Sequence, residues 1–265
     1  MAQHVVIIGN GIAGTTAARH IRKQSDCKIT IISEETKYFY SRTALMYIFM
    51  GHMRFEDTKP YEDWFWEKNR IDLIQARVIG IDYDQKMLSL QNGQTVTYDS
   101  LILATGSKSN KFGWPGQDLN GVQGLYHYHD LQMMENAAKS CKHAVVVGGG
   151  LIGIEMVEML LTRNIPVTML VRESKFWTNV LPGGDADFIG DHIKEHHVNV
   201  LYETELKEVV DNGSKQACAV ITNKGERIEA DFVGLTVGVH PNTLLVKDTK
   251  LELGRGILVL SLIHI

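Results

Sequence analysis

Apolar runs and polar segments alternate at the start of the chain with periods that predict a strand, a helix and a second strand. Residues 4–8 are nearly all apolar, as in a parallel strand covered on both faces. Residues 15–23 hold good helix formers and a basic last turn, which suits the helix dipole. Residues 28–33 are again mostly apolar. The pattern therefore predicts a βαβ unit.

The same order returns in the second half of the chain. An apolar run that begins at His143 precedes a predicted helix at 154–161 and a predicted strand at 166–171. Further strands are predicted within 78–98, 101–106, 198–209, 217–222 and 230–239, and one amphipathic helix at 185–193. The sequence therefore predicts an α/β protein with two Rossmann-like, three-layer units that include β-meanders.

Aromatic residues are concentrated between the two repeats, at 38–70. Thr58 and Pro60 favour the start of a helix in this stretch. Tyr61, Trp64 and Phe65 would share one face of that helix. We therefore expect these rings to pack against the first unit rather than to bind a ligand.

Each predicted unit carries a glycine turn between its first strand and its helix. The turns consist of Gly9, Gly11 and Gly14 in the first unit and of Gly148, Gly150 and Gly153 in the second. In a G-x-G-x-x-G turn two glycines let the backbone bend and approach a diphosphate, and the third lets helix and strand pack closely. The start of the helix adds free N–H groups. Two such turns in the same context predict two dinucleotide sites.

Charged residues stand where the second strand of each unit ends. Glu34 and Glu35 follow Gly9 by about 25 residues, close to the spacing of an acid that binds a ribose hydroxyl. Arg172 and Glu173 occupy the matching place in the second unit. An acid there suits a ribose diol, whereas an arginine suits a 2′-phosphate, so both forms of nucleotide stay open.

The composition is that of a globular protein. The 265 residues are 44% apolar and carry a net charge of −4, so nucleic acid is not an expected partner. No apolar run reaches the roughly 18 residues that span a bilayer, and no signal sequence precedes the first strand, so we expect a cytoplasmic location. Cys27, Cys141 and Cys218 are far apart and odd in number, which favours free thiols.

These residues resemble the flavoproteins with two dinucleotide domains, the pyridine nucleotide-disulfide oxidoreductase-like family. The likeness covers about residues 5–259 and includes Ala-Thr-Gly at 104–106, Trp-Pro-Gly at 114–116, Gly-Ile-Glu at 153–155 and Gly-Val-His-Pro-Asn at 238–242. It is strongest to the branch of rubredoxin and ferredoxin reductases, the flavin segment of nitrite reductase and apoptosis-inducing factor. The resemblance implies an FAD-dependent NAD(P)H oxidoreductase that passes hydride from nicotinamide to flavin and electrons to an acceptor.

The resemblance also implies which residues bind each cofactor. For FAD these are Gly9, Gly11, Ile12, Ala13, Gly14, Glu34, Glu35, Arg42, Val78, Ala104, Thr105 and Gly106. For NAD(P)H they are Gly148, Gly150, Leu151, Ile152, Gly153, Arg172, Glu173 and Gly238. Glu155 is the one side chain expected to act at the meeting of flavin and nicotinamide, as a group that tunes the local charge.

The chain departs from the family pattern at three places. Residues 38–47 lack the cysteines of the disulfide, coenzyme A and peroxide reductases, so no flavin-to-thiol relay is expected. Tyr47 stands where related reductases often have a lysine that pairs with the equivalent of Glu155. Asn110 stands where an arginine is often found.

The expected domains are the first part of an FAD domain at 1–115, an inserted NAD(P)H domain at 116–244, and the start of a return to the FAD domain at 245–265. Because the family continues beyond this return, we expect a C-terminally truncated chain. Residues 260–265 resemble the translation of a transposon end used as a sequencing adapter, which predicts an artefact rather than a homologous strand.

Several alternatives stay open. The acceptor is a small iron–sulfur protein, a rubredoxin, a quinone or oxygen, and the full-length protein is a monomer or a homodimer. A flavin redox sensor that responds to NAD(P)H, or a non-functional fragment, is the alternative to an enzyme. His192 and His196 match an H-x-x-E-H zinc pattern, but no third ligand is evident and no metal is expected. His127 and His129 are expected on an extended segment.

Overall fold

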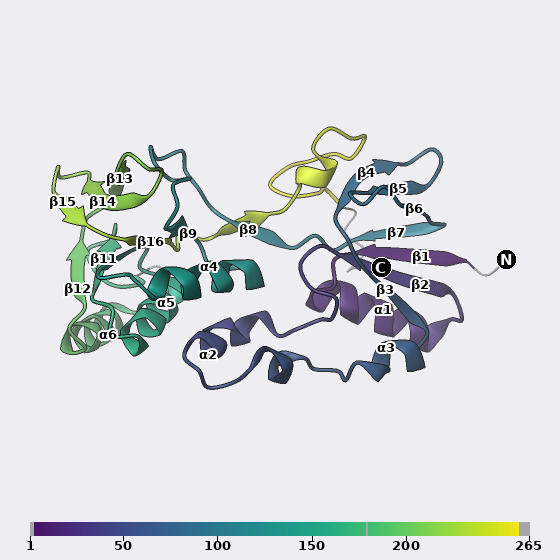
Figure 1. Ribbon diagram of the computed structural model, residues 1–265, viewed down its shortest axis with the longest axis horizontal. Coiled ribbons are helices and arrows are strands. Elements are labelled where there is room, and N and C mark those ends of the chain that lie inside the picture. The colour runs from purple at the N-terminus through teal and green to yellow at the C-terminus, as the bar shows by residue number, and fades with distance from the viewer. Residues whose placement is uncertain (1–2, 179, 260–265) are drawn as a thin grey trace. The chain divides into compact units, whose positions relative to one another are not determined.

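The computed structural model describes residues 3–178 and 180–259 and confirms the predicted α/β class with parallel sheets. The described chain divides into two compact units, each built around one parallel sheet (Figure 1). The first unit comprises residues 3–42, 53–108 and 240–259, and the second comprises 43–52 and 109–239. The predicted adapter-derived tail at 260–265 lies outside the described residues.

The first unit has a parallel sheet with strand order β3-β2-β1-β7. These strands are β1 (His4–Ile8), β2 (Lys28–Ser33), β3 (Ile71–Gln75) and β7 (Ser100–Leu103). One face packs on α1 (Ile12–Gln24) and α3 (Trp64–Lys68), and the other on an antiparallel meander of β4 (Val78–Asp82), β5 (Met87–Leu90) and β6 (Thr95–Thr97) (Figure 1). Val5 and Ile7 face the helices, while Val6 and Ile8 face the meander. An uninterrupted apolar strand therefore reflects burial on both faces.

The second unit repeats this architecture with the strand order β12-β11-β10-β16-β9. Its parallel strands are β9 (Val122–Gln123), β10 (Ala144–Val147), β11 (Val167–Val171), β12 (Asn199–Tyr202) and β16 (Phe232–Leu235). Its helices are α2 (Leu45–Phe49), α4 (Tyr128–Ala138), α5 (Leu151–Thr162) and α6 (Gly183–Glu195). The second meander is β13 (Leu206–Asp211), β14 (Ala217–Thr222) and β15 (Arg227–Glu229).

Short elements complete the described chain. They are η1 (Arg42–Ala44), η2 (Phe55–Thr58), η3 (Leu244–Val246) and the paired strands β8 (Ser107–Ser109) and β17 (Val239–Pro241). The order of strand, helix, strand, strand, meander, strand is thus the same in both units. In the first unit β1 lies between β2 and β7, and in the second unit β10 lies between β11 and β16. In both units, therefore, the first strand of the glycine turn lies beside the strand that follows the meander.

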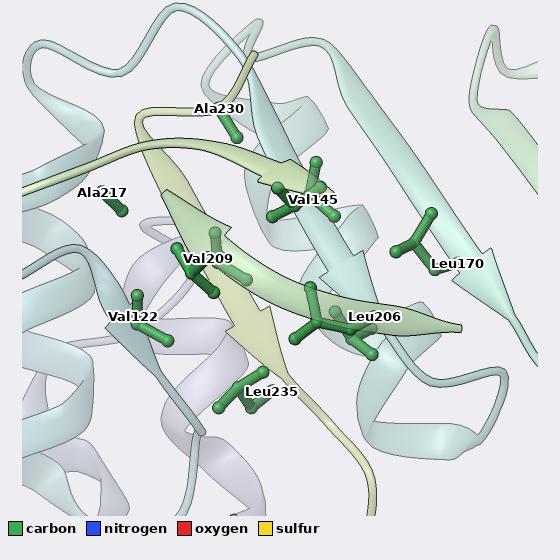
Figure 2. Packing of buried hydrophobic residues seen from close by; sticks show 11 residues of the cluster. Val122, Val145, Leu170, Leu206, Val209, Ala217, Ala230 and Leu235 are labelled. Carbon is green, nitrogen blue, oxygen red and sulfur yellow. The ribbon is translucent and has the colours of Figure 1, made fainter. Parts of the chain in front are cut away.

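The core of the second unit lies between its parallel sheet and its meander (Figure 2). Val145 and Leu170 of the sheet face Leu206 and Val209 of β13, and all four side chains are at most 5% exposed. Branched aliphatic side chains dominate this layer, so the burial of apolar surface is the main force that holds the meander on the sheet.

Three expectations about the fold are corrected. The helix predicted to start near Thr58 and Pro60 begins instead at Trp64, as α3, after a separate short helix that ends at Thr58. The buried tryptophan is Trp66, 3% exposed, while Trp64 is 56% exposed. Tyr61 precedes the helix and stacks on Phe65 with ring centroids 4.3 Å apart. His127 caps α4 and His129 lies inside it, because Asp130 accepts the N–H of His127 and closes the first turn.

Packing places residues 43–52 in the second unit, although they lie within the sequence of the first. Helix α2 packs against α4 and α5, and Arg163 at the end of α5 donates from Nη2 to the Phe49 carbonyl at 2.5 Å. Phe49 itself is fully buried. Among the described residues, no helix combines the length and the apolar character needed to cross a membrane.

A buried and an exposed leucine of the second unit test this account of the core. Leu170→Ala removes a side chain that is 1% exposed, and we expect a loss of about 2–5 kcal/mol in the free energy of unfolding from lost burial and the cavity left behind. Leu151→Ala removes a side chain that is 52% exposed and should change it by less than about 1 kcal/mol. Urea denaturation of both variants measures the difference, and equal losses would contradict it.

Candidate dinucleotide-binding sites

The first glycine turn joins β1 to α1 and has room for a ligand at only one of its glycines. Gly9 has φ of +110°, and a Cβ there would lie 2.1 Å from the Ala104 carbonyl oxygen. A Cβ at Gly14 would lie 2.0 Å from the Gly9 oxygen. At Gly11 a Cβ would meet nothing within 4 Å. Gly9 and Gly14 are therefore needed for the corner itself, whereas Gly11 leaves space beside the backbone.

The second turn, between β10 and α5, has the same geometry. Gly148 has φ of +121°, and a Cβ there would lie 2.7 Å from the Thr236 carbonyl oxygen. A Cβ at Gly153 would lie 2.3 Å from the Gly148 oxygen, while one at Gly150 would meet nothing within 4 Å. In both turns, therefore, the first and third glycines are needed for close packing, and the second leaves space beside the backbone.

Both helix starts are left open by the protein. Gly11 and Gly150 occupy the N-cap positions of α1 and α5, and neither helix start receives a side-chain cap. The first N–H groups of a helix lack partners within the helix, and the helix dipole adds positive potential there. Space beside the second glycine and uncapped N–H donors together fit a diphosphate at each turn.

The first helical residues of both turns also lack cover. Ile12 and Leu151 are 69% and 52% exposed although they are large and apolar. Ala13 is exposed and Ile152 is partly buried. Both apolar side chains therefore lie at the surface, beside the free backbone donors.

The end of β2 carries a network of charged and hydroxyl groups. Arg42 binds Glu35 through two contacts, Nη2 to Oε2 at 2.9 Å and Nη1 to Oε1 at 3.2 Å. The Tyr40 hydroxyl donates to the same Glu35 carboxylate and accepts from Arg42 Nη1 at 3.0 Å. The Glu35 side chain is only 13% exposed and that of Arg42 is 30% exposed. The network therefore fixes the guanidinium before any ligand arrives.

Glu34 is held much more loosely than its neighbour. Its carboxylate is 57% exposed and lies 3.5 Å from Arg77 Nε. Arg77 immediately precedes Val78, the first residue of β4, which is 9% exposed. The structure thus brings the end of β2 close to the start of the meander, where the family resemblance implies that Val78 contacts FAD.

The turn at 104–106 is tied to a later segment of the same unit. Thr105 Oγ1 donates to the Asn242 carbonyl at 2.7 Å, and Asn242 Nδ2 donates to the Thr105 carbonyl at 3.3 Å. The Asn242 N–H also donates to the Gly106 carbonyl at 2.9 Å. Gly106 has φ of +68°, which glycine adopts without strain. Three hydrogen bonds therefore hold the turn that also supplies the Ala104 oxygen beside Gly9.

In the second unit, the charged residues after β11 neutralise each other. Arg172 Nη2 lies 2.9 Å from Glu173 Oε1, and the side chains are 71% and 36% exposed. Lys175 Nζ lies 2.7 Å from Asp187 Oδ2 on α6. One acid balances each cation, so the arrangement favours neither a 2′-phosphate nor a ribose diol.

Gly238 lies two residues after Thr236 and is hydrogen-bonded to Asn110. It has φ of +88°, its carbonyl accepts the Asn110 N–H at 3.0 Å, and Asn110 Nδ2 donates to the Val237 carbonyl at 3.1 Å. Asn110, at the position of the family arginine, therefore ties the strand end at 237–238.

Glu155 lies on α5 with no hydrogen bond or ion pair to any other described residue. The pKa of its carboxyl is raised, first because burial disfavours the charged form and then because Glu158 is nearby. Tyr47, at the family's lysine position, is 45% exposed and lies in the same unit, with its ring centroid 6.3 Å from that of His52. A tyrosine supplies no positive charge, so nothing there lowers the pKa of Glu155.

The described residues hold neither a candidate metal cluster nor a disulfide. No group of three or more His, Cys, Asp or Glu side chains in this part of the chain could hold a metal ion. Cys27, Cys141 and Cys218 are all free, and burial raises the pKa of the Cys141 thiol to about 11. Cys141 is therefore a poor nucleophile near neutral pH.

Sequence reasoning missed three contributors to these sites. For Tyr40 the sequence offered only a weak signal, its place two residues before Arg42. Asn242 is the last residue of the Gly-Val-His-Pro-Asn motif. Asn10 is buried between Gly9 and Gly11, where its Nδ2 donates to the Thr36 carbonyl at 2.7 Å. An asparagine within the glycine motif could have indicated the contact with Thr36, because a side-chain amide can hydrogen-bond to the backbone of a neighbouring loop.

Comparison with known proteins assigns the family. The model described as "Pyridine nucleotide-disulphide oxidoreductase" matches residues 3–261. The ferredoxin–NAD(+) reductase subunit of the benzene 1,2-dioxygenase system of Pseudomonas putida is 32% identical, over 98% of this chain and 63% of the relative. A nitrite reductase named with NAD(P)H, from Bacillus subtilis, is 31% identical over 97% of this chain and 32% of its own length.

A solved structure shares the fold. The ferredoxin reductase of Rhodopseudomonas palustris superposes with a TM-score of 0.88 at 24% identity, over 97% of this chain and 64% of that one. The chain thus spans less than two thirds of the length of these relatives. Because the family model matches nearly every residue, the chain belongs to the pyridine nucleotide-disulphide oxidoreductases.

Proposed function

We propose that the protein is an FAD-dependent NAD(P)H oxidoreductase that passes electrons to a small iron–sulfur protein. One observation carries the proposal. In both glycine turns the first and third glycines lie against a carbonyl group, the second has free space beside it, and the helix that follows has no side-chain cap. The chain belongs to a family of FAD- and pyridine-nucleotide-dependent enzymes, in agreement with both predicted cofactors. The iron–sulfur acceptor is supported by the name of the Pseudomonas relative, a ferredoxin–NAD(+) reductase subunit.

In the first unit, the proposed roles follow from how tightly each group is held. Backbone N–H groups at the start of α1 bind the FAD diphosphate beside Gly11. Glu34, exposed and loosely paired, accepts hydrogen bonds from the ribose hydroxyls. Glu35 instead positions Arg42, which it contacts through both carboxylate oxygens. FAD, when bound, would accept a hydride and release electrons one at a time.

In the second unit, the start of α5 binds the diphosphate of the nicotinamide nucleotide beside Gly150. Arg172 and Glu173 face the adenosine ribose at the end of β11, and their ion pair must open for either residue to bind the nucleotide. Glu155 adjusts the charge near the nicotinamide without a basic partner. With every cysteine free and none in 38–47, we propose an electron path without a disulfide.

Anaerobic reduction tests the function. The purified protein is expected to show flavin absorption bands that bleach on addition of NADH or NADPH and return on addition of a ferredoxin, with many turnovers. Rubredoxin, a quinone and oxygen are compared as acceptors at equal concentration. Bleaching without turnover would favour the redox sensor, and a protein without flavin bands after gentle purification would defeat the FAD assignment.

Alanine at the open glycines separates cofactor binding from folding. Gly11→Ala adds a methyl group where the protein has space but a diphosphate would approach, so we expect unchanged folding and FAD binding weakened at least about tenfold. Gly150→Ala should weaken only nicotinamide nucleotide binding, again at least about tenfold. Calorimetric titration of each cofactor into each variant measures both effects.

The blocked glycines are the matched controls. Gly9→Ala and Gly148→Ala place a Cβ within 2.1 Å and 2.7 Å of a carbonyl oxygen and force alanine into positive φ. Both should lower the melting temperature even without cofactor. If Gly11→Ala bound FAD like the wild type, the diphosphate would not lie beside this turn.

The raised pKa of Glu155 predicts a pH-dependent stability. Because the folded pKa lies above the unfolded one, the carboxyl stabilises the fold below its unfolded pKa, and this contribution is lost as pH rises through the folded pKa. Glu155→Gln should therefore gain in melting temperature relative to the wild type as pH rises above the ordinary glutamate pKa of about 4.3. Glu195→Gln, whose side chain is 76% exposed, is the control. If the melting temperatures of the wild type and Glu155→Gln changed with pH in parallel, the raised pKa of Glu155 would be contradicted.

A further inference from the structure

The segment after β11 contains an aromatic residue with an unfavourable backbone conformation. Trp177 has φ of +49°, in the left-handed region that bulky side chains rarely adopt. Among the described residues, no other Trp, Tyr or Phe has a positive φ. Strained residues persist only where their surroundings hold them, and they cluster at sites that bind ligands.

Contacts on both sides hold Trp177 in this conformation. Its carbonyl accepts the N–H groups of Val180 and Leu181, each at 3.0 Å. The preceding Phe176 is 2% exposed and anchors the segment in the core. Lys175 ties the segment to α6 through its ion pair with Asp187. The indole is therefore presented from a segment that is fixed at several points.

Trp177 lies close in sequence to the residues proposed at the adenosine end of the nucleotide. It follows Glu173 by four residues, and Glu173 stands at the strand end where a ribose is bound. The Trp177 side chain is only partly buried, and its indole N–H has no acceptor among the described residues. On α6, Phe188 is 73% exposed, one position after Asp187. Aromatic surface is thus available beside the expected ribose site.

We propose that Trp177 stacks on the adenine ring of the nicotinamide nucleotide. This inference rests on the proposed function, since it extends the second dinucleotide site. An indole offers a wide planar face for a purine, and its backbone conformation aims that face without a change on binding.

Binding of ADP-ribose, which carries the adenine but no nicotinamide, tests the proposal. In calorimetric titrations, Trp177→Ala should bind ADP-ribose at least about tenfold more weakly than the wild type, as is typical for loss of a base-stacking ring. Trp177→Phe, which keeps a ring, should bind within about threefold of the wild type. Trp64→Ala, which removes a 56% exposed tryptophan of the first unit, should have no effect.

Tryptophan fluorescence gives a second readout that does not depend on the alanine variant. ADP-ribose should quench the emission of the wild type and of Trp64→Phe, and this quenching should be lost in Trp177→Phe. Circular dichroism checks that each variant is folded. If Trp177→Ala binds like the wild type, or if the quenching persists in Trp177→Phe, the stacking inference is overturned while the proposed function stands. If the wild type itself does not bind ADP-ribose, the proposed nucleotide site fails, and the stacking inference with it.

Discussion

The close approach of a helix to the end of a neighbouring strand is the constraint on which both units depend. At each corner the first glycine lies against the carbonyl of the strand that follows the meander, Ala104 in one unit and Thr236 in the other. The third glycine lies against the carbonyl of the first. No side chain fits at either position, so the helix can start directly above the sheet. Its free N–H groups then face the carboxyl ends of the strands, where ligands of such sheets bind.

The strained corners are supported by ordinary forces. Apolar strands buried on both faces fix the sheet, and each meander is held by a layer of aliphatic side chains such as Leu170 and Val209. Hydrogen bonds from Asn242 then fix the turn at 104–106 that faces the first corner. The charged groups that follow β2 and β11 are arranged differently in the two units. Glu35 is locked to Arg42 in a half-buried network, whereas Arg172 and Glu173 form an exposed pair that competes with solvent.

The sequence predicted the two repeats and both corners because local rules decide them. An apolar strand, three spaced glycines and a helix leave few alternatives. It did not predict which tryptophan is buried, because the helix begins only at Trp64, after Tyr61, so the face shared by Tyr61 and Trp64 does not form. Nor did it predict that residues 43–52 pack in the second unit, which depends on Arg163 and Phe49, more than 100 residues apart in the chain. Contacts such as Asn242 with Thr105 are likewise long-range and leave no periodic signal.

The uncapped helix starts also bear on how the protein matures. A helix normally finishes its first turn with a side chain of its own, yet at Gly11 and Gly150 the polypeptide supplies none. On the proposed function, a diphosphate that docks there would complete the turn from outside, so each cofactor would act as a structural part of one unit. Occupancy then stabilises that unit in proportion to the logarithm of the cofactor concentration. Under that proposal, a shortage of flavin would leave the first unit less stable, and the lifetime of the protein would depend on the supply of its cofactor.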